Sequence, residues 1–573
     1  MHATTLTTDV LIIGGGFAGL WAARQAATHV KDVLIVDKGP RDWGGLGGMS
    51  GGDMITLHED QDINEWLDEV VFFNDGLCDQ LMMLDTLRDS LPRFHDYEAM
   101  GHTFTRDGNG NYVRIPQRGL SHVSLTTSAP TGKGGINMRA ALLRSMEGCS
   151  VRRMGNIMIT AITKDGNRAS GAVGFFNRSG EPVSIRAKAV LITAGTGGWK
   201  ASYLQNSMAS GCVELALEAG ARLRNFEFID NWNVPKLFAW EGQTVLLPLG
   251  GRFINSRNEE FMAERYSPVL GSKTDTQYNI RGMVLEVKAG RGPIVFDTSR
   301  IPEKYMEEVT PAAGWMKLNN EKLKNLGVDF FKDKIEWMPQ PIASEGGIAT
   351  DLDGATEVEG LFAAGTAQSL PTGVYFGGLS ICHCATSGYK TGDAIGRYAA
   401  NCDAPAFDQD QAEELLNREL SRLGRTGIAP KDIVRVTQEL MAPVDVCILK
   451  TERGLERSLK RLEEVKNEFI PVMGAEDPHY LCKMVEARGM LMLTEAYLRS
   501  SLERTESRAG HFRADHPCRD DGTPLYWVEI RQHEGDMVIE RKELPLNSYP
   551  LKPYRYYMDQ FTFPLDEIQS FLR

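Results

Sequence analysis

The segment VLIIGGGFAGL, which begins at Val10, constrains the fold of this chain more than any other. Val10–Ile13 is an apolar run typical of a buried strand, and Phe17–Ala27 is rich in alanine with interspersed polar residues, as expected of a helix. Gly14, Gly16 and Gly19 follow the spacing G-x-G-x-x-G at their junction. There the first glycine permits a tight turn, the second lets the backbone approach a pyrophosphate, and the third lets helix pack on strand. The segment therefore predicts a dinucleotide-binding turn.

A second strand supports dinucleotide binding, and three further segments separate FAD from NAD as the dinucleotide. KDVLIVDKG supplies a second strand ending in Asp37, at the distance where a carboxylate binds ribose hydroxyls. Gly44–Gly52 suits a loop whose N–H groups contact a phosphate or flavin, and Ala187–Gly198 and Val358–Ala367 are further apolar strands that end in glycine turns. This arrangement resembles the two-dinucleotide FAD fold, whereas an NAD dehydrogenase would need only the first element. The expected FAD contacts are Gly14, Gly16, Phe17, Ala18, Gly19, Asp37, Lys38, Gly44, Gly45, Gly47, Gly48, Ser50, Gly51, Gly52, Ala194, Gly195, Thr196, Gly365, Thr366, Gly378, Leu379 and Ser380.

The amino-acid composition limits the classes of molecule that this protein is expected to bind. The formal charge of −13 disfavours nucleic acid or an anionic membrane, because phosphate binding needs clustered Lys and Arg. The nine cysteines are scattered without a C-x-x-C pair, so we expect no disulfide framework, no metal site and a reducing compartment such as the cytoplasm. We expect neither a signal peptide nor a membrane-inserted segment, because no charged n-region and no long apolar run is present.

At 573 residues the chain is long enough for several domains. The expected fold class is α/β: a two-dinucleotide, Rossmann-like FAD-binding domain with an inserted α+β capping domain, a C-terminal helical bundle and an extended tail. Short strands separated by Asp165-Gly166 and Ser179-Gly180 predict a β-meander within the FAD domain. The predicted boundaries are 1–230 and 339–405 for the FAD domain, 231–338 for the cap, 406–510 for the bundle and 511–573 for the tail.

Several motifs carry a family resemblance. NEEFMAERYSP (258–268), GGIATDLDGATEVEGLFAAGTA (346–367) and RTESRAGHFRADHPCRDD (504–521) resemble the flavoprotein subunits of the succinate dehydrogenase, fumarate reductase and adenylylsulfate reductase superfamily. KAGRGPIVFDTS (288–299) is most similar to the adenylylsulfate reductase α branch. The resemblance covers nearly the whole chain and implies hydride transfer between FAD and a small substrate, with a separate iron–sulfur protein as electron partner.

The chain departs from that family at the positions that define substrate and flavin attachment. Covalent members carry a His in the glycine loop, whereas Met49 and Ser50 stand here, so non-covalent FAD is expected. Succinate and fumarate enzymes place a His where Ile342–Glu345 stands, and their catalytic Arg would fall near Thr276. The adenylylsulfate reductase Arg would fall near Asn279. The sequence therefore leaves the substrate open and argues against both known reactions.

Two cap arginines are candidates for stabilising developing negative charge. Arg281 and Arg291 carry guanidinium groups, which hold carboxylate or sulfonyl-type oxygens in a bidentate manner. The alternative for either is an ion pair with the nearby Glu286 or Glu259.

Other catalytic candidates come from family positions or from the flavin-binding strand. Arg265 and Tyr266 match a cap motif, with cap packing as the alternative. His383 follows a glycine turn from which its ring would reach the flavin, unless it bonds to backbone at the start of a helix. Tyr375 and Glu345 flank the same region and are weaker candidates.

These features favour an FAD-dependent oxidoreductase subunit that moves hydride or electrons between a small organic or sulfur-containing substrate and a ferredoxin-like iron–sulfur partner. The alternative is a stand-alone flavin enzyme, similar to aspartate oxidase or ketosteroid dehydrogenase. The aromatic tail Tyr549–Phe563 is expected either at the partner interface or wrapped on its own chain. A homo- or hetero-oligomer is compatible with both readings.

Overall fold

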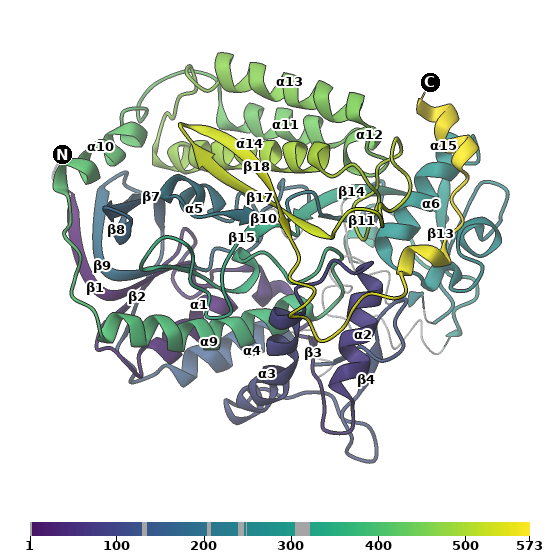
Figure 1. The fold of residues 1–573 in the computed structure, drawn as a ribbon, viewed down its shortest axis with the longest axis horizontal. Coiled ribbons are helices and arrows are strands. Elements are labelled where there is room, and N and C mark those ends of the chain that lie inside the picture. The colour runs from purple at the N-terminus through teal and green to yellow at the C-terminus, as the bar shows by residue number, and fades with distance from the viewer. Residues whose placement is uncertain are drawn as a thin grey trace.

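The computed structural model describes residues 3–128, 134–202, 208–238, 246–247, 249–303 and 321–572. Its main sheet has the order β6-β2-β1-β9-β8-β7, and β16 pairs with β9 beyond the end of β8 (Figure 1). The strands are β1 (Thr4–Ile13), β2 (Val33–Val36), β6 (Val151–Met154), β7 (Ile157–Asp165), β8 (Arg168–Phe176), β9 (Pro182–Ile192) and β16 (Leu361–Ala363). β6, β2, β1, β9 and β16 run parallel, so their carboxyl ends meet at one edge of the sheet.

Two helices pack closely on this sheet because small residues line their contact. α1 (Phe17–Ala26) lies against α9 (Leu379–Ala400). A Cβ on Gly388 would lie 2.7 Å from the carbonyl oxygen of Ala18, and one on Gly392 would lie 2.5 Å from that of Ala22. Only glycine allows this approach, which places the start of α9 beside the first glycine turn.

β7, β8 and β9 form consecutive antiparallel pairs, which confirms the predicted β-meander. The cap contains an antiparallel sheet of order β11-β14-β13-β12, on which α6 (Thr276–Lys288) packs. These strands are β11 (Ile229–Pro235), β12 (Arg252–Ile254), β13 (Ile294–Asp297) and β14 (Glu336–Ser344). The cap sheet extends beyond the predicted cap boundaries, 231–338, because β11 begins at Ile229 and β14 ends at Ser344. Both strands continue directly from the FAD domain.

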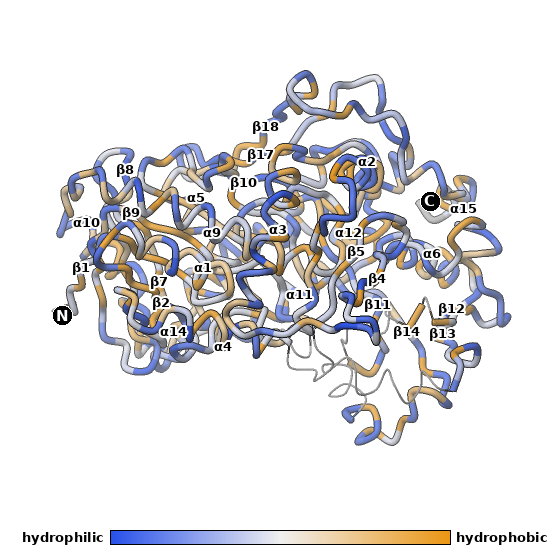
Figure 2. Tube along the Cα trace, turned by 90° about the horizontal axis from the view of Figure 1, so that it is seen from below, coloured by the Kyte–Doolittle hydropathy of each residue, from blue (hydrophilic) through white to orange (hydrophobic). Residues whose placement is uncertain are grey.

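Most of the remaining helices form two groups. The C-terminal bundle comprises α10 (Gln409–Leu420), α11 (Pro430–Met441), α12 (Val444–Cys447), α13 (Glu452–Glu468) and α14 (Pro478–Glu503). α2 (Ile63–Phe73), α3 (Gln80–Ala99), α4 (Gly134–Ser145) and the small sheet β3 (Met54–Ile55), β4 (Arg114–Pro116) and β5 (Ser124–Thr126) lie on the opposite side of the molecule in Figure 1. Hydrophobic segments run through the interior strands, and hydrophilic ones concentrate in outer loops (Figure 2). In the described part of the chain, no helix has the length and apolarity needed to cross a bilayer.

The tail is built into the fold. β17 (Tyr526–His533) and β18 (Asp536–Glu543) extend a sheet that contains β10 (Leu223–Arg224) and β15 (Gly347–Ile348), and α5 (Val213–Ala219) lies nearby. The chain then passes α2 and α6 and ends in α15 (Leu565–Leu572) beside the cap (Figure 1). Tyr557 is fully buried, and the ring of Phe561 stacks on Tyr278 at 3.8 Å between centroids. These aromatic residues therefore cover the chain's own cap instead of forming an exposed interface, although Tyr554 is 71% exposed.

Candidate functional site

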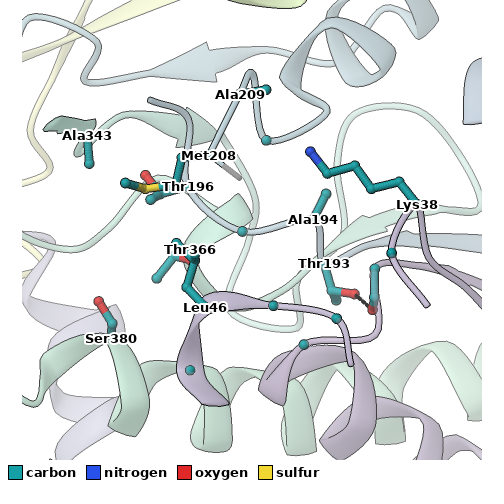
Figure 3. Close-up of a pocket in the computed structure, with 18 of the residues that line it drawn as sticks. Lys38, Leu46, Thr193, Ala194, Thr196, Met208, Ala209, Ala343, Thr366 and Ser380 are labelled. Atoms are coloured by element: carbon teal, nitrogen blue, oxygen red, sulfur yellow. Dashed lines mark hydrogen bonds between the residues drawn. The ribbon is translucent and has the colours of Figure 1, made fainter. Parts of the chain in front are cut away.

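A cavity of about 1630 Å³ extends from the carboxyl edge of the main sheet to the cap and the helical bundle. It begins at the β1–α1 turn, runs over the glycine loop and the start of α9, and ends beneath β11 and β14. Ligands of parallel α/β sheets bind at this carboxyl edge. Figure 3 shows Lys38, Thr193 and Ala194 on one side of the cavity and Thr196, Met208 and Ala343 on the other.

Each of the three glycines of the opening motif is required for a different structural reason. Gly14 has a φ of +111°, and its Cβ would lie 2.5 Å from the carbonyl oxygen of Thr193. The Thr193 hydroxyl donates to the Gly14 carbonyl at 2.7 Å, the dashed contact in Figure 3. A Cβ on Gly19 would lie 2.1 Å from that same carbonyl oxygen, so helix and turn touch. Among the described residues, a Cβ on Gly16 would meet only the Gly45 Cα, at 3.5 Å, and otherwise enters the cavity.

Asp37 fixes the turn and faces the cavity. One carboxylate oxygen accepts the N–H of Gly15 at 2.7 Å, and the other accepts the N–H of Gly39 at 2.6 Å. Each oxygen keeps a lone pair that a ribose hydroxyl can use. The glycine loop packs against Asp37 and the glycine turn. A Cβ on Gly44 would lie 2.1 Å from Asp37, and one on Gly45 would lie 2.6 Å from Gly16.

The start of α9 supplies positive electrostatic potential to the middle of the cavity. Gly378 precedes the helix with a φ of +80°, and Thr366, Ser380 and Cys384 line the cavity around it. The unpaired N–H groups of a helix N-terminus stabilise negative charge. This end therefore suits the pyrimidine part of a flavin, which becomes anionic on reduction.

Most of the predicted FAD contacts line this cavity. They are Gly14, Gly16, Phe17, Ala18, Asp37, Lys38, Gly44, Gly45, Gly47, Ser50, Gly51, Gly52, Ala194, Gly195, Thr196, Thr366, Gly378 and Ser380. Four others do not line it: Gly19, Gly48, Gly365 and Leu379. The three glycines allow close packing, since a Cβ would meet Gly14, Arg139 and Ala18 respectively, and Leu379 is fully buried in the core. These four residues therefore pack around the site, and their contact with FAD stays a prediction.

Three lysines surround one glutamate where the cavity meets the bundle. The Glu486 carboxylate, 3% exposed as a side chain, lies 2.7 Å from Lys38 Nζ, 3.0 Å from Lys200 Nζ and 2.9 Å from Lys483 Nζ. Although burial acts in the opposite direction, these cations hold the pKa of Glu486 well below its usual value. The cluster is cationic overall and suits the phosphate-bearing half of a dinucleotide.

The cap end of the cavity has a different chemistry. Asp230 on β11 accepts the indole N–H of Trp232 at 2.6 Å and the side-chain amide of Gln277 at 3.1 Å. Burial raises the pKa of Asp230 to about 7. Glu345, which follows β14, is 5% exposed, and burial, together with the charges of Asp230 and Asp275, raises its pKa well above the usual value.

Arg118, in the loop after β4, faces Asp230, and Tyr375 and Gln117 also line the cavity. Arg118, Asp230 and Trp232 were not predicted from the sequence, because no motif joins residues so far apart in the chain. The segment FEFIDNW also contains Glu227 and Asn231, so no signal in the sequence distinguishes Asp230 from its neighbours. Of the seven catalytic candidates named from the sequence, Tyr375 and Glu345 line the cavity.

Three of the other catalytic candidates gather around Glu286, away from the cavity. The guanidinium of Arg291 lies 2.8 Å from Glu286, the Tyr266 hydroxyl donates to Glu286 at 2.7 Å, and Arg265 lies 2.6 Å from Glu259. None of these side chains lines the cavity. Both arginines form ion pairs with glutamates, as the alternative to a catalytic role proposed for Arg291. The catalytic role of these three residues stays a prediction, and their position away from the cavity does not support it.

Arg281 and His383 are likewise engaged elsewhere. Arg281 donates to the carbonyl of Ala509 at 2.8 Å, which joins α6 to the start of the tail. His383 is 1% exposed, and its ring nitrogens lie 3.1 Å from Gln368 Oε1 and 3.4 Å from Thr86 Oγ1. Burial lowers its pKa to about 4. On α9 the side chains of Ser380 and Cys384 face the cavity, and that of His383 does not.

Comparison with known proteins agrees with this geometry. Residues 9–379 match the family model described as an FAD binding domain, and residues 437–556 match the fumarate reductase flavoprotein C-term. A chain of the fumarate reductase (CoM/CoB) from Methanothermobacter marburgensis is 27% identical, over 90% of this chain and 96% of the relative. L-aspartate oxidase from Yersinia pestis is 25% identical, over 89% of this chain and 96% of the relative.

Two solved structures share the fold. The FrdA chain of an E. coli quinol fumarate reductase variant has a TM-score of 0.86 at 21% identity and covers 97% of this chain and 99% of its own. Adenylylsulfate reductase from Archaeoglobus fulgidus has a TM-score of 0.79 at 20% identity, with 94% and 96% covered.

The fold and the cavity together define an oxidoreductase of the two-dinucleotide flavoprotein class. Within that class, the chain belongs to the FAD-binding family that includes the fumarate reductase and succinate dehydrogenase flavoproteins, which confirms the resemblance seen in the sequence. Its cofactor is FAD. The open space at Gly16 and the acceptor at Asp37 fit the pyrophosphate and ribose of that cofactor.

We expect acid precipitation of the purified protein to release all of its FAD. The glycine loop offers Met49 and Ser50 where a histidine would form the covalent bond, and the Ser50 hydroxyl donates to the carbonyl of Gly47 at 2.6 Å. The measurement is flavin absorbance in the supernatant and the pellet, with a covalent flavoprotein treated in parallel. Flavin that stays with the precipitated chain would contradict the prediction.

Proposed function

We propose that this chain is the catalytic flavoprotein of an oxidoreductase that exchanges hydride with a small substrate held at the Arg118 end of the cavity. Electrons then pass to or from a separate iron–sulfur protein. The observation that carries the proposal is that one cavity contains both the glycine turn and the buried acids Asp230 and Glu345. A reacting group at the cap end would therefore lie in the same cavity as the bound flavin, beneath β11 and β14.

Bound FAD supplies the two-electron chemistry. We propose that the N–H groups around Gly16 bind its pyrophosphate, that Asp37 binds a ribose, and that the start of α9 contacts the flavin ring near Ser380. Arg118 neutralises an anionic substrate group, and Tyr375 and Gln117 provide hydrogen bonds beside it. The cap strands β11 and β14 exclude water from the reacting atoms.

The names of the relatives support a separate electron partner. One relative is named as one of the subunits of a fumarate reductase, and a structural neighbour is a chain of a quinol fumarate reductase. L-aspartate oxidase, also a relative, favours the second candidate, a stand-alone enzyme that uses oxygen or a diffusible acceptor. All nine cysteines are free thiols, as a reducing compartment would keep them, and we place the activity in the cytoplasm.

An anaerobic flavin assay tests the proposal and separates these candidates. Unsaturated acids, enones and sulfur compounds are added to the reduced holoprotein while the return of flavin absorbance is followed. The reduced protein is then mixed with oxygen or with an oxidised ferredoxin. Rapid reoxidation by ferredoxin supports the paired enzyme, rapid reoxidation by oxygen supports the stand-alone one, and a flavin that exchanges electrons with no substrate would overturn the proposal.

We expect negligible turnover with fumarate or succinate. A dicarboxylate needs positive charge at both ends, yet Arg118 faces Asp230 in the described lining, and Glu345 and Tyr375 supply no positive charge. The loss of one charged contact costs several kcal/mol of transition-state binding. The measurement is fumarate reduction by a dithionite-reduced dye, with bleaching of the flavin by dithionite as the control. A rate typical of enzymes, on the order of 1–10³ per second, would contradict this.

A further inference from the structure

We propose that Asp230 and Glu345 form a proton-holding carboxyl pair that gives the substrate its proton, and that the substrate is a monoanion with a conjugated double bond whose charge is held by Arg118. The inference deepens the proposed function and rests on it.

The two carboxyl groups come from neighbouring strands, and the charge of Asp230 acts on Glu345. β11 and β14 are antiparallel, with Asp230 opposite Ala343 and Ile229 opposite Ser344. Glu345 is the next residue, and both side chains line the cap end of the cavity. A register shift after Asp230 turns the strand at that point, as bulges do when they re-aim a side chain toward a site.

One carboxyl oxygen of the pair lacks a hydrogen-bond partner, and this indicates a ligand. Both oxygens of Asp230 are engaged, by Trp232 and by Gln277. Oε2 of Glu345 is buried and has no hydrogen-bond partner among the described residues. Glu345 and Asp230 are 5% and 8% exposed. A buried polar atom without a partner is costly, so its persistence beside a cavity indicates a group that is completed by substrate.

The surrounding charges keep at least one of these carboxyls protonated near neutral pH. Burial raises the pKa of both groups, the charge of Asp275 at the start of α6 adds to the rise on both, and the charge of Asp230 adds to the rise on Glu345. Arg118 faces Asp230 and Asp275, Arg281 faces Asp275, and Tyr557 from the tail contacts Asp275. Two acids that repel each other in a dry site share protons, and one then acts as a general acid.

The reductive step balances with these groups alone and with the reduced FAD of the proposed function. A hydride with its electron pair leaves the reduced flavin and bonds to the β-carbon of a carbon–carbon double bond conjugated to an acyl group. The proton of Glu345 bonds to the α-carbon, and the carbon–carbon π bond is lost. The flavin is oxidised, the substrate is reduced by two electrons, and Glu345 is left as a carboxylate that regains a proton from solvent through the pair.

The charge of the site defines the substrate class. Arg118 pairs with one anionic group, whereas a second anionic group would lie against Asp230 and Glu345 and be repelled. The acyl group next to the double bond is therefore neutral, as in an ester, amide or thioester. Fumarate and its monomethyl ester are matched probes, because they share a carbon skeleton and differ by one charge.

The first experiment measures binding of these two probes to the oxidised holoprotein from the change in flavin absorbance between pH 6 and pH 9. We expect the monomethyl ester to bind at least tenfold more tightly than fumarate at pH 7.5. Because the pair has raised pKa values, its protonated, less anionic form predominates at low pH, so both probes should bind less tightly as the pH rises. Equal affinities, or binding independent of pH, would overturn the proposal.

The second experiment assigns the effect to the pair by comparing Asp230→Asn and Glu345→Gln with the wild type and with Glu214→Gln. Glu214 is also a buried carboxyl with a raised pKa, but it lies outside the cavity lining. Each substitution should remove a protonated-carboxyl band from the infrared spectrum. Only the two cavity variants should flatten the pH dependence of binding and reduce the preference for the ester. A flattened profile in Glu214→Gln, or an unchanged one in both cavity variants that retain FAD, would overturn it.

Failure of this inference is distinguishable from failure of the proposed function. If substrates exchange electrons with the flavin while the cavity variants keep wild-type pH profiles, the carboxyl pair is excluded and the oxidoreductase function stands. If a cavity variant loses FAD, the test is the infrared spectrum of the wild-type holoprotein at acid and at alkaline pH. Protonated-carboxyl bands that do not change with pH would overturn the inference. Bands that change with pH would support it.

Discussion

Gly16→Val is expected to give a folded but colourless protein. A side chain at this position meets only the Gly45 Cα among the described residues and otherwise projects into the cavity, so the protein itself tolerates it. The same volume is where the backbone must approach the pyrophosphate. We therefore expect FAD stoichiometry to fall from one to nearly zero, measured from the ratio of flavin to protein absorbance, with the circular dichroism spectrum retained.

Gly108→Val is the matched control, because Gly108 is exposed and a Cβ there meets nothing within 4 Å among the described residues. It should bind FAD as the wild type does. Normal flavin content in folded Gly16→Val would show that the motif is only a turn.

Arg504→Ala is expected to destabilise the protein by about 3–5 kcal/mol, the cost of breaking a buried ion pair by removing one partner. The guanidinium is fully buried, lies 2.8 Å from Glu227 and 3.0 Å from Glu506, and donates to the carbonyl of Tyr526 at 2.9 Å. Truncation leaves the buried Glu227 carboxylate without its cation. The measurement is the shift in the urea midpoint of unfolding, evaluated at constant slope.

Arg461→Ala provides the comparison, because its guanidinium lies 2.9 Å from Glu464 with both side chains about half exposed to solvent. Exposed pairs contribute roughly 0–1 kcal/mol, so its midpoint should barely move. If both variants unfold at the same urea concentration, the buried cluster around Arg504 contributes no more to stability than a surface pair.

The elements that depend on local patterns could be predicted from the sequence. Val10–Ile13 forms the expected buried strand, the meander follows its turn residues, and the bundle predicted over 406–510 contains α10 to α14. Each depends on periodicity or turn chemistry within a short window, which a single sequence displays. The cofactor-binding turn was accessible for the same reason, since its spacing is contained in six residues.

The cap end of the site was not accessible in this way. Arg291 was a plausible substrate ligand until the structure paired it with Glu286 and Glu567, and no sequence pattern reveals such pairing. Arg118 and Asp230 were missed because the chain brings them together only through the cap sheet and the loop after β4. An assembly of residues from separate elements has no period, so it appears only in three dimensions.

The interleaved sheets have a consequence for how this protein is synthesised. β9 is synthesised long before β16, the strand that pairs with its carboxyl end. Likewise, β10 is synthesised long before its partner β17, in which Ile530 pairs with Leu223. While translation continues, the amino-terminal half therefore has unpaired strand edges, which recruit other chains and aggregate. Slower induction at lower temperature should raise the soluble yield of the full chain, whereas a chain that stops before Tyr526 should stay insoluble.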